Sequence, residues 1–293
     1  MNVKDELEKI VEFISGYAEN DEEVVVPVSG GIDSDVVARL CVRALGSKKV
    51  RLFIVVQSDM ESKFLDNARN LADDLDVSLS EIHLETANEA LMKALEDGDK
   101  NQTFNMAYDL EAAKAKCSVR SAVISCYQDK GFLIAGTTNR TEWELGFFLT
   151  FGDHLSHFKP LAHLYKSRVL ELGQFVGTRR EVLEQEPTAG FWSGQTDKED
   201  LAYWIINDGP ILRPRDFSEE ERKLAEMWKD QLTIERIDRC LCMLSKGQND
   251  KKIAASTNLT EEMVRGLRHI TEKAKKYKSR DIFKHMERRE DAL

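Results

Sequence analysis

The most constraining feature of this chain is a β-branched run that breaks into two glycines and then continues as an amphipathic segment. The run covers residues 24–28, the glycines are Gly30 and Gly31, and the amphipathic segment covers residues 35–45. This order predicts a buried strand, a loop whose glycines let the backbone approach an anion, and a helix whose first amides point at that anion. Asp33 falls within the loop, where a carboxylate is useful mainly if a cation accompanies phosphates. The alternative, a tight turn capped by Ser or Asp, needs only one glycine.

Strand-like runs alternate with helical patterns along the first half of the chain. Apolar residues at helical spacing predict an opening helix before the first strand. Further strands are expected at residues 51–56, 82–84 and 132–135, and further helices at residues 63–75, 89–96 and 110–129. The alternation predicts an α/β fold with a doubly wound, mostly parallel sheet. Its ligand site would lie at the carboxyl ends of the strands, where residues 29–34 and 136–139 fall.

The chain shows no Pro/Gly/Ser-rich linker that would divide it. We therefore expect one domain over residues 1–293, of which residues 218–293 form a C-terminal helical extension. Residues 188–200 are polar, contain Gly190 and Gly194 and have little periodicity. This composition predicts a mobile loop and a candidate lid.

Composition narrows the classes of partner. The 42 Lys and Arg residues against 52 Asp and Glu residues give a net charge of −10, which disfavours nucleic acid as a main partner. The sequence contains no secretory signal pattern and no apolar run long enough to span a bilayer. Five cysteines lack paired spacing, which predicts buried reduced thiols and a cytoplasmic setting. They are Cys41, Cys117, Cys126, Cys240 and Cys242.

A second candidate ligand segment follows the strand expected at residues 132–135. Residues 136–142 combine a strand end, a turn and then Glu142, one turn into the next helix. Alone, this pattern is typical of a helix cap with a solvated acid. Further motifs follow in order, however: Gly152 with Asp153, residues 164–166, residues 187–192 and residues 194–197.

Together with the glycine loop, these ordered motifs resemble those of the NAD synthase family, within the N-type ATP pyrophosphatases. The resemblance covers residues 24 to 280, approximately, and implies an adenine nucleotide α-hydrolase-like fold. It implies that the pyrophosphate loop and a further ATP contact are formed by Ser29, Gly30, Gly31, Asp33, Ser34 and Thr137.

The resemblance also implies catalytic and metal-binding roles. Asp33, Glu142 and Thr188 would share Mg²⁺, and Lys166 would hold the γ-phosphate. The catalytic residues would be Asp33, Lys166 and Asp153. These roles suit the chemistry, because Mg²⁺ takes hard oxygen ligands and a lysine acts as a point charge on leaving pyrophosphate.

Members of the family amidate deamido-NAD in two steps. The carboxylate attacks the α-phosphorus of ATP and pyrophosphate leaves, and ammonia then displaces AMP from the acyl adenylate. In glutamine-dependent members an amidohydrolase domain supplies ammonia, whereas only residues 1–23 precede the first expected strand here. The resemblance therefore implies that free ammonia, or a separate partner, is the donor, and that the protein is a homodimer.

The acceptor half of the motif set departs from the family. After Asp153 the family usually continues with small residues and an acid, whereas this chain has His154, Leu155 and His157. The family also tends to have a motif with two arginines just before its central helix. In this chain Arg120 clearly matches one of them, while Lys114 and Lys116 could supply charge from shifted positions.

Arg120, His154 and His157 are therefore candidate acceptor-binding residues, and a different small carboxylate is an alternative acceptor. A protonated histidine in place of an acid would favour an anionic acceptor group. A metal pair of His154 and His157 is disfavoured, because no third ligand stands at fitting spacing.

The C-terminal segment suggests an alternative of another class. Residues 251–267 predict a helix, a turn and a second helix with basic character, which could make a nucleotide-responsive DNA-binding regulator. NAD synthases end with a similar helical segment, and the acidic chain disfavours DNA, so a packing extension is the preferred interpretation. A tRNA-modifying pyrophosphatase fits poorly, since no paired cysteine motif is present.

Overall fold

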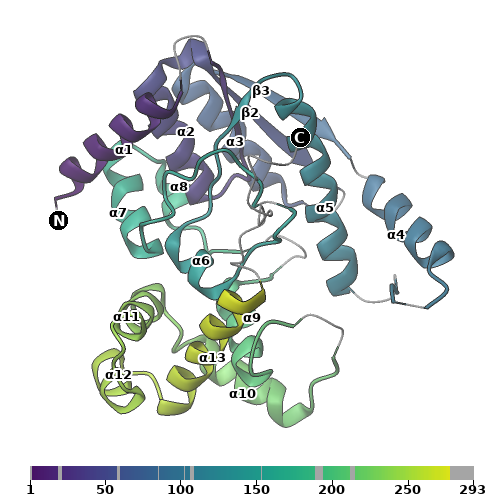
Figure 1. Cartoon of the computed structure of the whole chain (residues 1–293), viewed down its shortest axis with the longest axis vertical. Coiled ribbons are helices and arrows are strands. Elements are labelled where there is room, and N and C mark those ends of the chain that lie inside the picture. The colour runs from purple at the N-terminus through teal and green to yellow at the C-terminus, as the bar shows by residue number, and fades with distance from the viewer. Residues whose placement is uncertain are drawn as a thin grey trace, which may run out of the picture.

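The computed structural model describes residues 2–18, 22–57, 60–84, 86–101, 103–105, 109–152, 154–188, 194–211 and 215–277, with the backbone alone for residues 109–114 and 277. Within this part of the chain four parallel strands form one sheet in the order β3-β2-β1-β4 (Figure 1). They are β1 (Val24–Pro27), β2 (Val50–Val56), β3 (Ser78–His83) and β4 (Leu133–Ile134). Val24 is paired with Val50 on one side and with Leu133 on the other. The predicted parallel α/β sheet is confirmed.

Helices cover both faces of the sheet because β1 is apolar on both faces. Val24 and Val26 point into a core that also includes apolar residues of α1 (Val3–Tyr17), α2 (Ile32–Leu45), α3 (Ser62–Leu75) and α7 (Lys166–Val176). Val25 points to the opposite face, where it lies in a cluster with Ile124 of α5 (Asp109–Gln128). A β-branched run buried on both sides is typical of a central parallel strand.

Two expected elements differ in their bounds. The third strand begins at Ser78, not at residue 82, because β3 is an edge strand whose exposed positions do not require apolar residues. Within the predicted loop, residues 197–200 are helical instead. They begin α9 (Asp197–Ile206), where the Thr196 side chain accepts a hydrogen bond from the Glu199 amide. The stretch 189–193 of the candidate lid lies outside the described residues.

The sheet lobe also contains elements that lie between those already named. They are η1 (Ser47–Lys49), α4 (Ala87–Gly98), α6 (Arg140–Leu145) and α8 (Arg180–Leu183). Among the cysteines, Cys41, Cys117 and Cys240 are buried as predicted, whereas Cys126 is exposed and Cys242 is partly exposed. The described residues include no helix with both the length and the apolarity needed to cross a bilayer.

A second lobe, in the lower half of Figure 1, consists of helices with a hydrophobic core of their own. Its helices are α9, α10 (Glu219–Lys229), α11 (Ile234–Ser245), α12 (Asp250–Thr257) and α13 (Glu261–Tyr277). Leu145 of α6 inserts into this core and joins the two lobes. The packed unit includes α9 as well as the segment after residue 218, and the division of the chain into domains stays a prediction.

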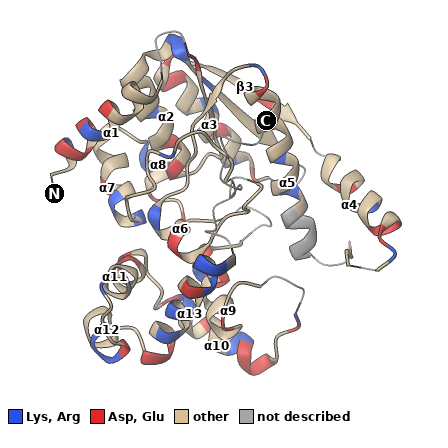
Figure 2. Ribbon diagram, viewed as in Figure 1, with Lys and Arg blue, Asp and Glu red and all other residues tan. Residues whose placement is uncertain are grey.

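Charged side chains of both signs are spread over the outer helices, as expected for faces in contact with solvent. Figure 2 shows Lys and Arg interspersed with Asp and Glu along the outer helices of both lobes. Helix α13, the second helix of the DNA-reading alternative, begins with Glu261 and Glu262 and packs against α6 and α9. An acidic start and two packed sides do not suit insertion into a DNA groove.

Candidate active site

The loop from Ser29 to Ser34 joins the carboxyl end of β1 to α2. Gly30 has φ +75°, and a Cβ there would lie 2.2 Å from the Phe64 carbonyl oxygen, so this position requires glycine. The Ser34 hydroxyl donates to the Gly31 carbonyl oxygen at 3.0 Å and accepts from the Ser29 amide at 3.1 Å. Gly31 occupies the N-cap of α2, so the alternative of a Ser or Asp cap is wrong. The loop therefore leaves helix amides available for an anion.

Asn67 supports this loop from α3. Its side-chain amide donates to the Gly30 carbonyl oxygen at 3.0 Å and to the Gln185 side-chain oxygen at 3.1 Å. Asn67 is buried, so these contacts also satisfy a polar group that would otherwise be costly to desolvate. The backbone of the loop is thus held from outside as well as by its own hydroxyls.

A cluster of charged side chains lies beside the loop at the carboxyl edge of the sheet. The Lys166 ammonium, at the first position of α7, is hydrogen-bonded to Asp33 of α2 and lies 3.7 Å from the Glu142 carboxylate of α6. The Asn139 side-chain amide donates to Asp33 Oδ1 at 2.9 Å. The fold therefore brings together three residues that the sequence resemblance assigned to ATP and Mg²⁺.

Glu142 has a structural role as well as its place in the cluster. It forms a capping box with Asn139. The backbone amide of Asn139 donates to Glu142 Oε2 at 3.2 Å, and the side-chain oxygen of Asn139 accepts from the Glu142 backbone amide at 3.0 Å. The capping interpretation of this segment is therefore correct, but the acid is not a solvated one, because it faces Lys166. The cap fixes the direction in which Glu142 points.

The charged groups alter one another's protonation. Burial by itself lowers the pKa of Lys166, but the nearby carboxylates, Asp33 foremost, raise it above its ordinary value. Burial and then Asp33 raise the pKa of Glu142, while Lys166 acts in the opposite direction. Burial also raises the pKa of Asp197, at the start of α9. The site holds more carboxylates than one ammonium neutralises, which suits an additional cation.

A large cavity of about 270 Å³ opens over the loop and the cluster. Thr137, Thr188 and Arg120, which the sequence analysis assigned to ATP, Mg²⁺ and the acceptor, all line it. Arg120 donates to the Gln57 side-chain oxygen at 2.9 Å, at the carboxyl end of β2. Proteins usually bind Mg²⁺ through one or two carboxylates together with phosphate oxygens of the substrate. Asp33 and Glu142 fit this ion.

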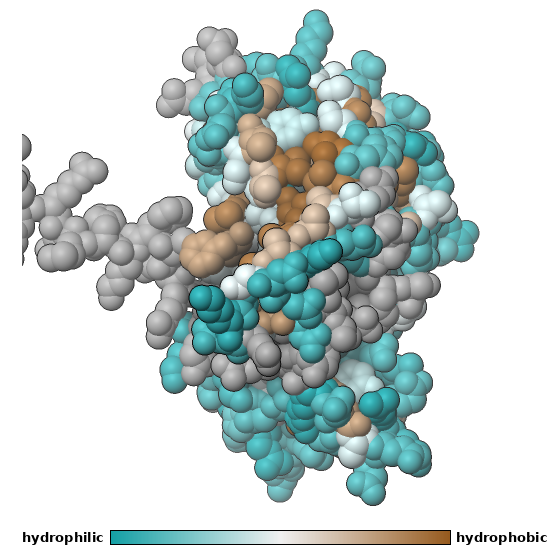
Figure 3. Space-filling view, turned by 90° about the vertical axis from the view of Figure 1, so that its right-hand side faces the viewer, coloured by the Kyte–Doolittle hydropathy of each residue, from teal (hydrophilic) through white to brown (hydrophobic). Residues whose placement is uncertain are grey.

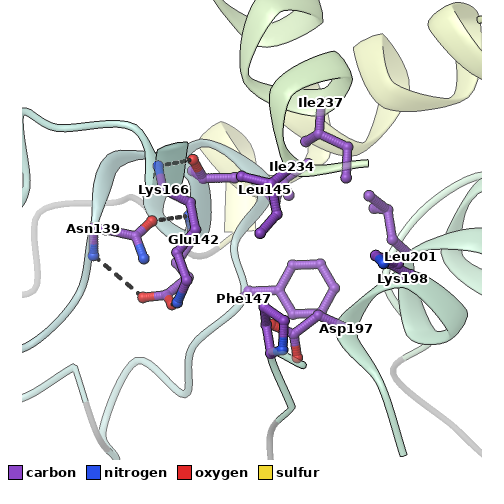
Figure 4. A pocket seen from close by; sticks show the side chains of 12 residues that line it. Asn139, Glu142, Leu145, Phe147, Lys166, Asp197, Lys198, Leu201, Ile234 and Ile237 are labelled. Carbon is purple, nitrogen blue, oxygen red and sulfur yellow. Dashed lines mark hydrogen bonds and ion pairs between the residues drawn. The ribbon is translucent and has the colours of Figure 1, made fainter. Parts of the chain in front are cut away.

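A smaller, mostly apolar pocket lies on the side of the cluster that faces the helical lobe (Figure 4). Glu142, Lys166 and Asp197 line both cavities. The apolar wall of the smaller pocket comes from both lobes. It consists of Leu145, Phe147, Leu201, Ile234 and Ile237.

A stack of rings links α6 to the segment that follows it, which carries the candidate acceptor residues His154 and His157. His154 is 6% exposed, and its ring centroid lies 4.3 Å from that of Phe148 and 4.9 Å from that of Trp143. Burial, and to a lesser degree Lys159, lowers the pKa of His154 to about 4. The rings exclude water that would solvate its charge, so His154 is neutral near pH 7. The expected preference for an anionic acceptor concerned a histidine in place of the family's acid, which is His157, and it stays a prediction.

His157 is tied to the sheet instead. Its Nδ1 accepts a hydrogen bond from the Ile134 amide at 2.9 Å, and its own amide donates to the Ile134 carbonyl oxygen at 2.9 Å. In the part of the chain that the structure describes, no three His, Cys, Asp or Glu side chains are placed to bind a metal ion, so a histidine metal site is not found. Binding of the acceptor by His154 and His157 stays a prediction.

Some predicted site residues lie outside the described residues, and some residues of the site were not predicted. Asp153 and the side chain of Lys114 lie outside them, while Lys116 is buried. Asn139 and Asp197 stand within motifs quoted above but had no role assigned. Gln57 could have been found from its position directly after a strand.

An anion-binding glycine loop and a lysine–carboxylate cluster at the carboxyl edge of a parallel sheet define a nucleotide-binding α/β enzyme. The family model described as NAD synthase matches residues 6–231, and the chain belongs to that family. It is 29% identical to the NH(3)-dependent NAD(+) synthetase of Methanocaldococcus jannaschii over 263 residues, 87% of each chain.

Two further relatives agree with this membership. The NH(3)-dependent NAD(+) synthetase of Pyrococcus horikoshii is 31% identical over 264 residues, 88% of this chain and 96% of that one. The solved structure of an NMN synthetase from Francisella tularensis has a TM-score of 0.62 and 26% identity, covering 79% of this chain and 94% of that one. Helices α11 to α13 lie beyond the stretch matched by the family model.

Proposed function

We propose that this protein is an ammonia-dependent NAD synthase, which uses ATP to adenylate the carboxylate of deamido-NAD and then forms the amide with ammonia. The observation that carries the proposal is the Lys166 ammonium, held between Asp33 and Glu142 beside the glycine loop. Family membership and the curated relatives support it.

The residues divide the work by position. Amides of the loop and the first turn of α2 bind phosphate oxygens, and Lys166 stabilises charge on the leaving pyrophosphate. Asp33 and Glu142, with Thr188 of the same cavity lining, would hold Mg²⁺, which would neutralise phosphate charge when bound.

The reaction needs no covalent enzyme nucleophile. A carboxylate oxygen of the acceptor forms a bond to the α-phosphorus while the bond to the β-phosphate oxygen breaks and pyrophosphate leaves. Ammonia then attacks the acyl carbon, AMP leaves, and one proton is lost from nitrogen. Positioning in a cavity and charge neutralisation supply the catalysis.

The test is the product spectrum with ATP, Mg²⁺, ammonium and deamido-NAD. AMP, pyrophosphate and NAD should appear in equal amounts, and ammonium should support turnover where glutamine alone does not. ADP and phosphate as products would contradict cleavage between the α and β phosphates. Omitting deamido-NAD is the control for uncoupled ATP hydrolysis.

A smaller acceptor is a second candidate. His154, which replaces a small residue of the family, is neutral and stacks on Trp143 and Phe148, and the chain is similar to an NMN synthetase. Nicotinic acid mononucleotide is therefore the acceptor to compare. A higher kcat/KM for the mononucleotide than for deamido-NAD would favour the second candidate, and the reverse would reject it.

We also propose a homodimer in a cytoplasmic setting. The supporting surface is the face of the sheet lobe where Figure 3 shows apolar side chains gathered; partly exposed apolar residues on this side come from β3 and α5. An isologous pair would remove such a face from water. Light scattering should give twice the chain mass of 33.4 kDa, and a monomer at micromolar concentration would contradict the dimer. The five unpaired cysteines support a reducing compartment.

A further inference from the structure

Asp238 on α11 reaches from the helical lobe to the charged cluster of the sheet lobe. It is 4% exposed. Its Oδ1 accepts a hydrogen bond from the Thr141 hydroxyl at 2.6 Å, and its Oδ2 accepts one from the Ser167 amide at 2.7 Å. Both donors lie next to residues of the charged cluster, since Thr141 precedes Glu142 and Ser167 follows Lys166.

Thr141 completes a path to the backbone of Lys166. Its hydroxyl oxygen accepts a hydrogen bond from the Lys166 amide at 2.9 Å while the hydroxyl hydrogen is donated to Asp238. The first two amides of α7 are thus satisfied by groups from α6 and α11. Among the described residues, Tyr165 at the N-cap of α7 makes no side-chain bond to the helix, so Thr141 and Asp238 supply the missing cap.

We propose that Asp238 is a positioning residue for Lys166, so that a helix of the second lobe fixes the cation of the pyrophosphate site. The role of Lys166 rests on the function proposed above. Lys166 is the first helical residue of α7, and it lines both cavities. A displacement of this helical turn therefore moves the ammonium relative to Asp33 and Glu142.

The choice of residue supports positioning over simple packing. A buried carboxylate is costly unless its oxygens are bonded, and here each oxygen has a donor at the helix terminus where negative charge is favoured. An apolar residue would join the lobes at lower desolvation cost, as Leu145 does nearby. Asp238 also fixes the orientation of α11 relative to the start of α7, because each of its two oxygens accepts from one particular donor.

The test compares Asp238→Asn with Asp250→Asn in the full-length protein. Asparagine keeps the shape of Asp238 but can accept at one end only, and its amide would face a donor at the other. Asp250 is the matched control, since it lies on α12 of the same lobe and accepts from Arg268 Nε at 3.0 Å, away from α7. Thr141→Val and Thr141→Ser form a second pair that removes or keeps the hydroxyl.

Two readouts separate positioning from folding. We expect Asp238→Asn and Thr141→Val each to lower kcat by roughly 10- to 100-fold, the effect of a displacement near 1 Å. Thr141→Ser should restore most of that loss, and Asp250→Asn should leave kcat unchanged. The kcat of the double variant Asp238→Asn with Thr141→Val should be no lower than that of the less active single variant, since both changes break the same hydrogen-bonded path.

The second readout is the affinity for inorganic pyrophosphate, measured calorimetrically with EDTA present. It should fall in Asp238→Asn and stay at the wild-type value in Asp250→Asn. A folded Asp238→Asn protein with both kcat and pyrophosphate affinity within twofold of wild type would overturn the proposal. If Asp238→Asn does not fold, equal kcat values for Thr141→Val and Thr141→Ser would overturn it. Absence of NAD formation by the wild type would instead reject the proposed function, while the pyrophosphate affinities would still test Asp238.

Discussion

Helix α6 separates two regions, a cluster of charges around Lys166 and a stack of rings around His154. Thr141 and Glu142 face the charges, whereas Trp143 is part of the stack. The charged region collects side chains from α2, α6, α7 and α11, with sequence separations of up to 133 residues between hydrogen-bonded partners. The ring stack takes all its members from residues 143–154.

The difference shows what each region depends on. Opposite charges in a partly dry site stabilise each other only while their helices keep their relative positions, so the charged region is sensitive to every element that carries it. Rings that are neighbours in sequence exclude water by local packing. Changes in the stack should therefore alter the acceptor side and stability, and leave the phosphate chemistry largely intact.

The largest effect is expected at the centre of the charged region. Lys166→Met should lower kcat/KM by roughly 100- to 1000-fold, the loss typical of one preorganised group that faces developing charge. Lys198→Met is the control, since Lys198 lines the smaller pocket but pairs with Glu186 at 3.0 Å. Steady-state kinetics of AMP release measure both variants, and a loss below tenfold for Lys166→Met would reject its role.

Glu142→Gln tests the charge of the cluster apart from the helix cap. Glutamine can keep the capping bond to the Asn139 amide, so the loss of activity, roughly 100-fold, should come without a large loss of stability. Glu144→Gln on the same helix is the control, because Glu144 pairs with Arg140 at 2.7 Å. Magnesium titrations of turnover and thermal unfolding distinguish the two effects. Equal activity of Glu142→Gln and Glu144→Gln would show that Glu142 only caps the helix.

Gly30→Ala tests whether the shape of the loop matters as the charges do. The added Cβ meets the Phe64 backbone at 2.2 Å, so the loop must move, and we expect the KM for ATP to rise roughly tenfold. Gly46→Ala is matched in its positive φ, at +82°, but has no neighbour within 4 Å. It should lose stability, because a side chain is strained at this backbone conformation, and it should keep its ATP affinity. The same KM in both variants would show that the loop backbone does not contact the nucleotide.

The smallest effect is expected in the ring stack. The pKa of His154 lies near 4 in the folded chain against an ordinary 6.5, so between these values the unfolded chain binds more protons. Stability is therefore fully present above pH 6.5 and falls as the pH decreases, by about 1 kcal/mol at pH 5.5.

His154→Phe should abolish this part of the pH dependence, as measured by urea unfolding at pH 7.5 and pH 5.5. Phe148→Leu should lower stability at both values and reduce the slope only in part, because it removes one ring that keeps water from His154 but leaves the titrating group. An unchanged slope in His154→Phe would show that His154 is not buried as neutral imidazole. Near-normal kcat/KM for ATP in both variants would agree with the separation of the two regions.

Local sequence was sufficient for the elements that carry the site. The β-branched run before two glycines predicted β1, the loop and α2, because burial on both faces and close backbone approach leave few residue types possible. Ordered motifs then identified Asp33, Glu142 and Lys166, and the fold brings them together. The capping box of Glu142 was also visible in residues 139–142, since it depends on spacing along a single helix turn.

Tertiary structure alone decided the environment of these groups. Nothing around residue 154 indicated that His154 would be neutral, because its pKa depends on how closely Trp143 and Phe148 exclude water. The helix that begins at Asp197 replaced part of an expected loop, and Asp238 had no local pattern to mark it. Desolvation and a hydrogen bond between residues about 100 positions apart depend on packing in three dimensions. The sequence by itself determined which charges this protein has at its nucleotide site; packing decided which partners hold them in place.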